Sequence, residues 1–434
     1  MEQLLGSVTI ADTIIKDIKK SVNNVGDFEK KVGEYTQKNT TDLLGVILFS
    51  AIILEASDIH IEPQESQVRL RTRFDGILYD ITFFEQTIYH NLLSRLKLLS
   101  KIKLNITEKP QDGRFTVLLE DSLIEIRIST LPSEWGESIV MRILNPKNLI
   151  ALEMLGLRKD VYATLEQELK KPTGMAVVAG PTGCGKTTTL YAILMKIHNP
   201  GIKIITIEDP IEYHLTGVSQ TQTAPEKGYS FTKGLMSIVR QDPDVILVGE
   251  IRDSGTAQIA VQAALTGHLV LSTLHSNDAA GAIPRLVDLK ADISSISSAL
   301  KIVVSQRLIR RVCKNCSVLT KPSVEELKEI KKGLKNIPKE IEIPKDLNKV
   351  KTAKAKEKGC LSCNLTGYRG RKGIFELFLA DAEIEKFILT NPSVSSIKEL
   401  LVKRGMVTIY QSGLIEVVLG QTTLEEVKRV VGSD

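Results

Sequence analysis

The spacing of apolar and polar positions predicts helices at the start of the chain. Between residues 10 and 22, isoleucine and valine recur at helical spacing, which is typical of one amphipathic helix. Residues 1–40 are otherwise polar, and they are too few to form a domain. Residues 41–57 predict a second, mostly apolar helix that Thr41 or Asp42 can cap.

The pattern then changes to the alternation that is typical of strands. Apolar residues between positions 68 and 74 alternate with Arg69, Arg71 and Arg73, and isoleucines alternate with polar residues around Ile126. Alternation of this kind indicates strands that bury one face. We therefore predict a small α+β domain over residues 41–147.

A third pattern covers residues 148–312, where short apolar runs without alternation are followed by glycine-rich turns and helical stretches. Strands that are buried on both faces of a parallel sheet have this appearance. The runs are Met175–Ala179, Lys203–Ile207, Val245–Val248 and Leu269–Ser272. An α/β nucleotide-binding domain is the expected structure.

Two further segments complete the predicted organisation. Residues 313–363 begin and end with a pair of cysteines and carry a lysine-rich insert, Lys321–Lys358. Residues 364–434 show helical periodicity and predict a small C-terminal helical domain. We find no internal repeat.

Composition narrows the class of protein. The chain has 434 residues, 42% of them hydrophobic and 25% charged, which is ordinary for globular domains and excludes disordered, collagen-like and disulfide-stapled chains. The longest apolar run, Leu43–Leu54, is shorter than the roughly 20 residues that cross a bilayer. With no secretory signal at its start, the chain is expected to be soluble and cytoplasmic.

Charge is distributed unevenly. Residues 301–372 hold 20 Lys and Arg against 7 Asp and Glu, whereas the whole chain carries a net charge of only +5. Such a basic block suggests an acidic partner, for which anionic lipid, nucleic acid or an acidic protein face are candidates. Few aromatic residues interleave with the lysines, which makes single-stranded nucleic acid unlikely as the partner.

The sequence after the first apolar run of the α/β domain predicts a phosphate-binding loop. It fits the pattern G-x-x-x-x-G-K-[ST], with a strand before it and a helix after it. Backbone N–H groups of such a loop hold the phosphates of ATP, Lys186 reaches the β- and γ-phosphates, and the Thr187 hydroxyl holds Mg²⁺. The expected nucleotide-binding residues are Gly180, Pro181, Thr182, Gly183, Cys184, Gly185, Lys186, Thr187 and Thr188.

Carboxylates follow two of the neighbouring strands. Glu208 and Glu212 come after the second apolar run, and Glu250 comes after the third, where it matches a Walker-B strand with Glu in place of the commoner Asp. Because ligands bind at the carboxyl ends of parallel strands, all three are catalytic candidates, and which Glu activates water is left open. His275 is a candidate γ-phosphate sensor, and His268 at the other end of its strand is a second.

Two interpretations fit the arginines that alternate along one strand. Arg69, Arg71 and Arg73 lie on the same strand face, which is usually a solvated surface. Alternatively, they reach a nucleotide that is held by a neighbouring subunit, where guanidinium groups stabilise the developing phosphate charge.

Four of the five cysteines predict a metal site. Two Cys-x-x-Cys pairs are typical of metal ligands in a cytosolic chain, and four thiolates form a closed tetrahedral shell around a structural Zn²⁺. The ligands are Cys313, Cys316, Cys360 and Cys363, and degenerate, metal-free thiols are the alternative.

These motifs together resemble the cytoplasmic assembly ATPases of type II secretion and type IV pilus extension, the GspE and PilB type. The resemblance covers residues 41–434. Beside the phosphate loop, the matching blocks are Ser57–Pro63, Pro110–Arg114, Ser129–Pro132, the aspartate box Ile207–Tyr213, Arg240–Asp244, the Walker-B segment Gly249–Asp253, the histidine box Thr266–Asp278, Gln306–Leu308 and Gly367–Arg371.

The resemblance implies a fold and an assembly. It implies an α/β protein with an N-terminal PAS-like α+β domain, a RecA-like P-loop motor domain, a zinc-ribbon insert and a small C-terminal helical domain. It further implies a homo-hexamer that holds ATP at subunit interfaces, with Arg71, Arg73 and Arg127 approaching the nucleotide.

The implied partner is an inner-membrane platform protein, at which filaments of pilin-like subunits assemble. The protein would then work as a peripheral protein at the inner face of the cytoplasmic membrane, where the anionic membrane surface is a further partner. The family's larger N-terminal docking domain is expected to be mostly missing ahead of residue 41. The tetracysteine site argues against the pilus-retraction ATPases.

Three functional hypotheses remain open from sequence. The leading one is a motor ATPase for filament assembly, in either type II secretion or type IV pilus extension. A RecA-like DNA translocase or helicase with a zinc ribbon is the alternative. A nucleotide switch without hydrolysis is the third, and the strand-end glutamates argue against it.

Overall fold

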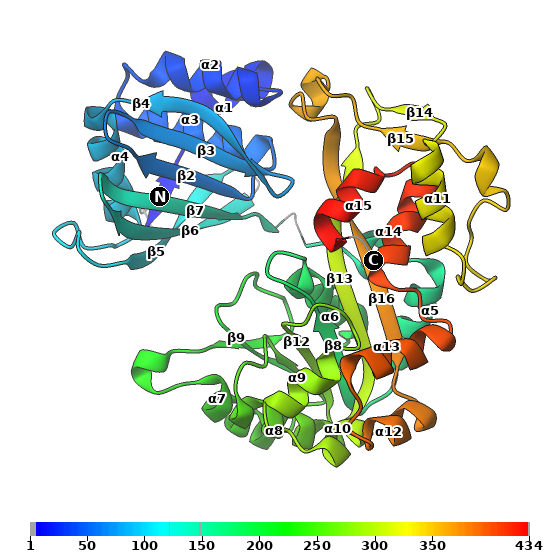
Figure 1. Ribbon diagram of the computed structural model, residues 1–434. Coiled ribbons are helices and arrows are strands. Elements are labelled where there is room, and N and C mark those ends of the chain that lie inside the picture. Colours follow the sequence, from blue (N-terminus) through cyan, green and yellow to red (C-terminus); the bar gives the residue numbers. More distant parts are fainter. Residues whose placement is uncertain (1–5, 121, 147–148, 433–434) are drawn as a thin grey trace. The chain divides into compact units, whose positions relative to one another are not determined.

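Two sheets of seven strands each organise the computed structural model, which describes residues 6–120, 122–146 and 149–432 (Figure 1). The chain divides into two units. The first holds the described residues before Leu149, together with Cys313–Ser317 and Ala355–Gly370. The second holds Leu149–Val312, Val318–Lys354 and the described residues from Arg371 onward. The predicted boundary between residues 147 and 148 lies outside the described residues.

The sheet of the first unit has the order β1-β5-β6-β7-β2-β3-β4. β1 and β5 are parallel, and the other neighbouring strands are antiparallel. The strands are β1 (Ser7–Thr9), β2 (Asp58–Pro63), β3 (Val68–Phe74), β4 (Ile77–Phe84), β5 (Gln111–Leu119), β6 (Ser122–Ser133) and β7 (Gly136–Leu144). The predicted alternation is present in β3, where every second side chain is buried and the arginines between them are partly exposed.

Helices complete the core of the first unit: α1 (Asp12–Ser21), α2 (Val25–Tyr35), α3 (Thr40–Ile53) and α4 (Gln86–Leu99). The apolar α3 contacts all three of the other helices, which explains why its middle turns are buried on every side. Ile18 of α1 and Phe28 of α2 are fully buried in the same core.

The structure therefore differs from the predicted division at residue 40. Residues 7–9 form an edge strand of the sheet, and α1 and α2 pack against α3, so the described residues before 41 belong to the same folded unit. The parallel pairing of β1 with β5 joins segments that are distant in the sequence, and no local pattern signals it.

The second unit contains a sheet of order β10-β9-β11-β12-β8-β13-β16, in which every pair from β10 to β13 is parallel. Its strands are β8 (Gly174–Ala179), β9 (Ile204–Glu208), β10 (Ser219–Gln222), β11 (Val245–Val248), β12 (Leu269–Leu274), β13 (Leu300–Val312) and β16 (Tyr368–Leu379). All four predicted apolar runs are strands of this sheet. Residues 368–379, which were expected in a helical domain, are an edge strand instead.

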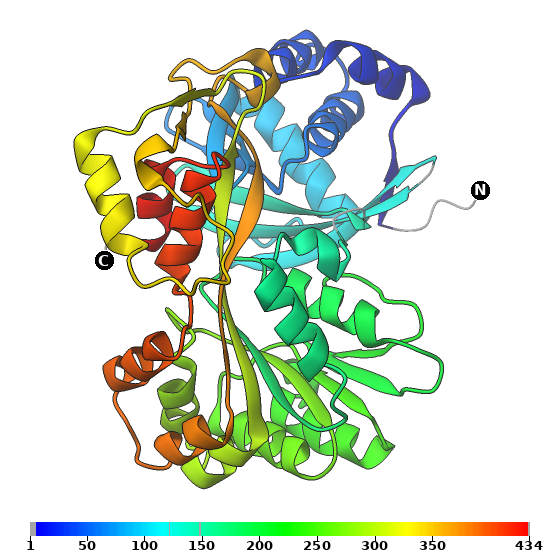
Figure 2. The ribbon, with the colours of Figure 1, turned by 90° about the vertical axis from the view of Figure 1, so that its right-hand side faces the viewer.

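Both faces of the central strands are covered (Figures 1 and 2). Met175 and Val177 of β8 belong to one hydrophobic core, and the intervening Ala176 and Val178 belong to another. Because neighbouring side chains of a strand point to opposite faces, helices must cover both sides, which explains the absence of alternation in the sequence. The covering helices are α5 (Lys159–Glu168), α6 (Lys186–Ile197), α7 (Phe231–Ile238), α8 (Ser254–Leu265), α9 (Ala282–Asp288), α10 (Ile293–Ala299), α12 (Ala382–Ile388) and α13 (Val394–Lys403).

Most of the lysine-rich insert, up to Lys354, belongs to the second unit, whereas Ala355–Lys358 and the cysteine pairs that flank the insert belong to the first. The insert forms α11 (Val324–Gly333) and β15 (Thr352–Lys354), and β15 pairs with β14 (Val318–Thr320), which directly precedes the insert. Ile330 and Leu334 pack in a small core with side chains of α14 (Ile409–Val418) and α15 (Leu424–Val431). In the described part of the chain, no helix combines the length and the apolar content that a bilayer crossing would need.

Candidate nucleotide site and metal centre

The phosphate loop lies between a strand and a helix, as the sequence predicts. β8 ends at Ala179 and α6 begins at Lys186, and the helix has no side-chain cap at its N-terminus. A Cβ at Gly180 would lie 2.6 Å from Cys184 Sγ, and one at Gly185 would lie 2.9 Å from Gln306 Nε2. Because both positions also have positive φ angles, glycine is required there. The uncapped N–H groups of α6 suit an anion.

Lys186 is folded against its own loop. Its Nζ donates hydrogen bonds to the carbonyl oxygens of Gly180 and Pro181, at 2.9 and 3.0 Å. Burial lowers the pKa of Lys186 below its usual value. Pro181, Thr182, Gly183 and Thr187 are exposed, whereas Cys184 is buried, and burial raises the pKa of its thiol. Cys184 therefore packs beneath the loop as a small protonated side chain.

Glu250 and His275 lie beside this loop, at the carboxyl ends of β11 and β12. Glu250 Oε2 is 3.5 Å from His275 Nε2, and Glu250 Oε1 is 2.5 Å from an Arg252 guanidinium nitrogen. Burial and the positive charge of Lys186 lower the pKa of His275, against the opposing effect of Glu250. The structure thus brings Glu250 and His275 together, and the charge of Lys186 acts on the histidine.

Glu208 lies in a different environment. Its side chain is buried, and the carboxylate accepts hydrogen bonds from the Tyr191 hydroxyl, from Thr206 Oγ1 at 2.6 Å and from Gln220 Nε2 at 3.1 Å. Burial raises the pKa of Tyr191, and the charge of Glu208 raises it further. Glu212 donates its backbone N–H to the same hydroxyl, at 3.2 Å. Glu208 is therefore hydrogen-bonded to Tyr191 on the buried face of α6.

The second histidine candidate serves a local role. His268 Nδ1 is 3.0 Å from the carbonyl oxygen of Ala263, near the end of α8. It precedes β12, whereas His275 follows β12. Because the strands are parallel, His268 lies at the edge of the sheet opposite the phosphate loop.

Two polar residues of β13 were missed as site residues. Gln306 is buried and accepts a hydrogen bond from Thr189 Oγ1 at 2.6 Å, which connects β13 to α6. Arg307 donates to the carbonyl oxygen of Gln306 at 2.9 Å and to that of Asn277 in the histidine box at 2.5 Å. The available signal was the matching block Gln306–Leu308, whose first two residues are polar and follow the apolar run Ile302–Val304 after one serine.

The arginines of β3 belong to the first unit, and each of them faces a carboxylate. Arg69 pairs with Asp80 at 2.7 Å, Arg71 with Glu62 at 2.5 Å, and Arg73 Nε is 3.4 Å from Asp58. Neighbouring strands supply these acids, so the face is an ion-pair network rather than a purely solvated stripe. Their role toward a nucleotide stays a prediction.

The four cysteines of the predicted metal site come together. Their Sγ atoms all lie within 4.8 Å of one another, and three of the separations are 3.7, 3.7 and 3.8 Å. A tetrahedron with Zn–S bonds of about 2.3 Å has edges of about 3.8 Å, so this donor set fits Zn²⁺. Burial opposes a charge on Cys363, but N–H donors from Cys360 and Gly367 outweigh it and lower its pKa to about 7.

The cysteine knuckles pack within the first unit. The backbone N–H of Val25 donates to Asn364 Oδ1 at 2.9 Å, and that of Gly370 donates to Asp75 Oδ2 at 2.8 Å. The sequence grouped the knuckles with the insert between them. The structure separates the two, because the insert packs with the C-terminal helices of the second unit.

With this geometry established, comparison with known proteins identifies the family. Residues 35–429 match the model of the family described as type II/IV secretion system protein. The chain belongs to this family. Its curated members include a type II secretion system protein E from Aeromonas hydrophila, which is 41% identical over 90% of this chain and 75% of its own length. A type IV pilus assembly ATPase PilB from Thermus thermophilus is 42% identical over 88% of this chain.

The chain spans only 42% of the length of the Thermus protein. Among solved structures of the secretion ATPases, the Legionella pneumophila ATPase DotB has a TM-score of 0.65 at 20% identity and covers 91% of this chain and 96% of its own. The pilus retraction motor PilT, solved with bound ADP, has a TM-score of 0.59 at 25% identity and covers 88% of this chain and 95% of its own. The chain therefore shares the α/β fold of these two ATPases.

Proposed function

We propose that this protein binds ATP and Mg²⁺ at the phosphate loop, hydrolyses the nucleotide, and couples hydrolysis to the assembly of pilin-like filaments. The observation that carries this proposal is the cluster of Lys186, Glu250 and His275 at one edge of the parallel sheet. Relatives named for type II secretion and for pilus assembly support it equally, so both systems remain candidates. Those names favour filament assembly over the DNA-translocase alternative.

Each residue of the cluster has a distinct task in the proposed reaction. N–H groups of the loop and Lys186 hold the phosphates, and Thr187 holds the magnesium ion, which neutralises charge on the phosphates. Glu250 orients the attacking water, because its carboxylate is only partly buried and lies beside His275, whereas that of Glu208 is buried. His275 contacts the γ-phosphate as a neutral imidazole that donates one hydrogen bond.

Glu208 has a positioning role in this proposal. Its oxygens are engaged by three donors of its own unit, and Tyr191 connects it to the helix that follows the phosphate loop. Arg307 bridges the histidine box and β13 in a similar way, through two backbone carbonyl oxygens. Movements of the box and of the loop would therefore be coupled.

The family also supports finer proposals about assembly. We propose a hexamer that works as a peripheral protein at the inner face of the cytoplasmic membrane, against a platform protein. The first unit is the proposed PAS-like domain, and its Arg71 and Arg73 reach a nucleotide that a neighbouring subunit holds. The cysteine centre is a zinc ribbon of structural character, since four thiolates leave no coordination position for a substrate.

Phosphate release by the purified full-length chain tests the catalytic assignment. Lys186→Ala is expected to abolish turnover. Glu250→Gln is expected to lower kcat by roughly 10²-fold or more while a fluorescent ATP analogue still binds, because the lost interaction serves the transition state. Glu208→Gln is expected to lower the melting temperature as well as turnover, because it breaks a buried network.

Glu357→Gln is the matched control, since this carboxylate is exposed and lies in the first unit. It is expected to leave both turnover and melting temperature unchanged. Wild-type turnover in Glu250→Gln would contradict the assignment of the water-orienting role.

A further inference from the structure

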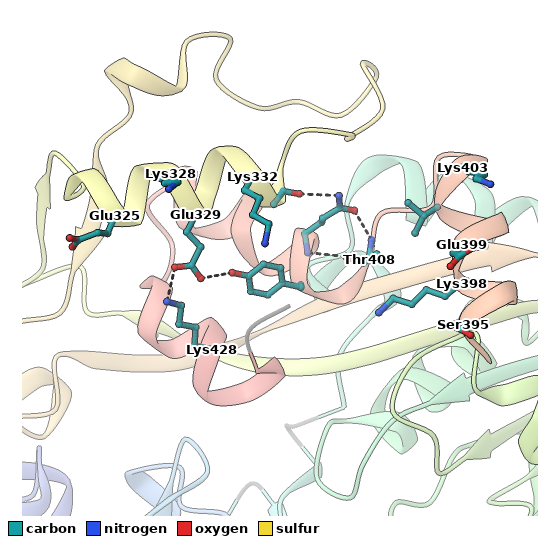
Figure 3. A pocket seen from close by; sticks show the side chains of 14 residues that line it. Glu325, Lys328, Glu329, Lys332, Ser395, Lys398, Glu399, Lys403, Thr408 and Lys428 are labelled. Carbon is teal, nitrogen blue, oxygen red and sulfur yellow. Dashed lines mark hydrogen bonds and ion pairs between the residues drawn. The ribbon is translucent and has the colours of Figure 1, made fainter. Parts of the chain in front are cut away.

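A groove of about 1000 Å³ lies in the second unit, outside the nucleotide site. Two helix faces form its walls: the face of α11 between Glu325 and Lys332, and the face of α13 between Ser395 and Lys403. The beginning of α14 lies between them, and Lys428 of α15 closes one end (Figure 3). α11 is the helix of the lysine-rich insert, which has no role in the proposed reaction of the nucleotide.

The rim of this groove is cationic. Five lysines and three glutamates line the groove. The negative charge of Glu329 is balanced by Lys428, which donates a hydrogen bond to it at 2.7 Å, and the Tyr410 hydroxyl donates a second one, also at 2.7 Å. Glu325 lies in the first turn of α11, where a carboxylate offsets the helix dipole. The remaining lysines are Lys328, Lys332, Lys398 and Lys403, and no carboxylate of the described chain lies within ion-pair distance of them.

The floor of the groove is largely apolar. Val402 is half-buried there, Tyr410 lies buried beneath it with its hydroxyl hydrogen-bonded to Glu329, and Gly333 adds no side chain. The methylene stems of the lysines extend this apolar surface, while their ammonium groups reach toward water. An apolar floor beneath a cationic rim suits a ligand with one apolar face and acidic flanks.

We propose that this groove binds an acidic amphipathic helix of a partner protein. The volume corresponds to roughly two turns of a helix of about 11 Å diameter. The apolar stripe of such a helix would cover Val402 and the methylene stems of the lysines, and its carboxylates would meet Lys328 and Lys398 on the two walls. A flat bilayer fits less well, because it presents polar headgroups to the groove and offers no apolar stripe to cover the floor.

The first experiment measures binding of a fluorescein-labelled synthetic peptide to the full-length protein by fluorescence anisotropy. The peptide has about 18 residues, with leucine at helical spacing on one face and glutamate on its flanks. A second peptide carries lysine in place of every glutamate, and a third scrambles the order of the first. Only the first peptide is expected to bind, and its affinity should fall as salt concentration rises.

Charge reversal locates the binding surface. Lys328→Glu and Lys398→Glu are each expected to weaken binding about tenfold, because each places a negative charge against the acidic flank of the peptide. Lys345→Glu is the matched control, since it reverses an exposed lysine of the same insert outside the groove, and it should bind like wild type. All three variants should keep the wild-type melting temperature, which shows that they are folded.

Three outcomes would overturn the proposal. The first is failure of the acidic peptide to bind, and the second is binding that Lys328→Glu and Lys398→Glu leave unchanged. The third uses vesicles of phosphatidylglycerol and phosphatidylcholine in sedimentation: if vesicles bind in a Lys328- and Lys398-dependent way and the peptide does not, the occupant is a membrane. Loss of nucleotide turnover in Lys186→Ala leaves this test unaffected, so it is independent of the proposed function.

Discussion

Glu376 accepts the backbone N–H of Ala279 at 2.8 Å, although its carboxylate is almost fully buried. Its second oxygen accepts the N–H of Ile409, the first residue of α14, also at 2.8 Å. Ala279 follows the histidine box on the chain. One carboxylate of β16 therefore connects the segment after His275 with the C-terminal helices of the second unit.

Glu376→Gln is expected to destabilise the protein, because an amide offers one acceptor oxygen where two N–H groups need acceptors. The expected loss is about 1–3 kcal/mol in the free energy of unfolding, measured by denaturant titration. Glu383→Gln, at an exposed position of α12, is the control and should change stability little. A Glu376→Gln protein as stable as wild type would show that the two hydrogen bonds to Glu376 do not stabilise the fold.

The same residue predicts a pH dependence. Burial raises the pKa of Glu376 above its ordinary value of 4.5. Its contribution to stability is therefore fully present below pH 4.5 and is lost as the pH rises through the folded pKa. The unfolding free energy of wild type minus that of Glu376→Gln, measured at a series of pH values from 4 upward, should therefore decrease as the pH rises. A difference that does not vary with pH would contradict this prediction.

Glu426 is expected to behave in the opposite way. It is buried in α15, and burial alone would raise its pKa, but hydrogen bonds from Arg429 and Arg310 outweigh this effect and lower the pKa. Its contribution is present above the unfolded pKa and is lost as the pH falls through the folded pKa. Glu426→Gln should cost about 3–5 kcal/mol at pH 7, since it leaves Arg310 without its charge partner.

The comparison of the two glutamates is itself a control. Both are buried acids of the second unit, so a general effect of pH on the stability of that unit should affect both variants equally. Thermal unfolding across the acidic range should show Glu426→Gln approaching wild type as the pH falls. A gap that widens toward low pH would disprove the ion-pair assignment.

Zinc should be bound at one ion per chain. Elemental analysis of the purified protein is expected to find this ratio, and Cys360→Ser together with Cys363→Ser should abolish it. Because metal binding contributes to folding, a chelator should lower the melting temperature of the wild type and leave the double variant unaffected. Cys184→Ser is the control, since this thiol packs beneath the phosphate loop and should not alter zinc content. Absence of zinc in the wild type would contradict the metal centre.

Turnover measurements on variants of β3 test the proposed arginine fingers. Arg71→Ala and Arg73→Ala are expected to lower turnover about tenfold or more, because a guanidinium stabilises charge that develops on the phosphates. Arg69→Ala is the control on the same strand face, where Asp80 engages the guanidinium through two hydrogen bonds. Equal effects of all three substitutions would show that these ion pairs stabilise only the first unit.

Local features of the protein are predictable from its sequence. The phosphate loop between β8 and α6 depends on glycine conformations and on a lysine at a set spacing, all within a few residues. The buried parallel strands are recognisable because both of their faces are covered, which removes alternation. The two cysteine pairs predict a shared metal ion, because few arrangements other than a metal site bring four thiols together.

Contacts between distant segments decided the rest. β1 pairs with β5, β16 extends the sheet of the second unit, and the insert packs with α14 rather than with the cysteines beside it. The distinction between Glu208 and Glu250 also depends on such contacts, since Tyr191, Thr206 and Gln220 donate hydrogen bonds to the first, whereas Arg252 and His275 face the second. Two strand-end glutamates are equivalent in a sequence. They differ only when the folded chain determines which donors each carboxylate meets and how much water remains around it.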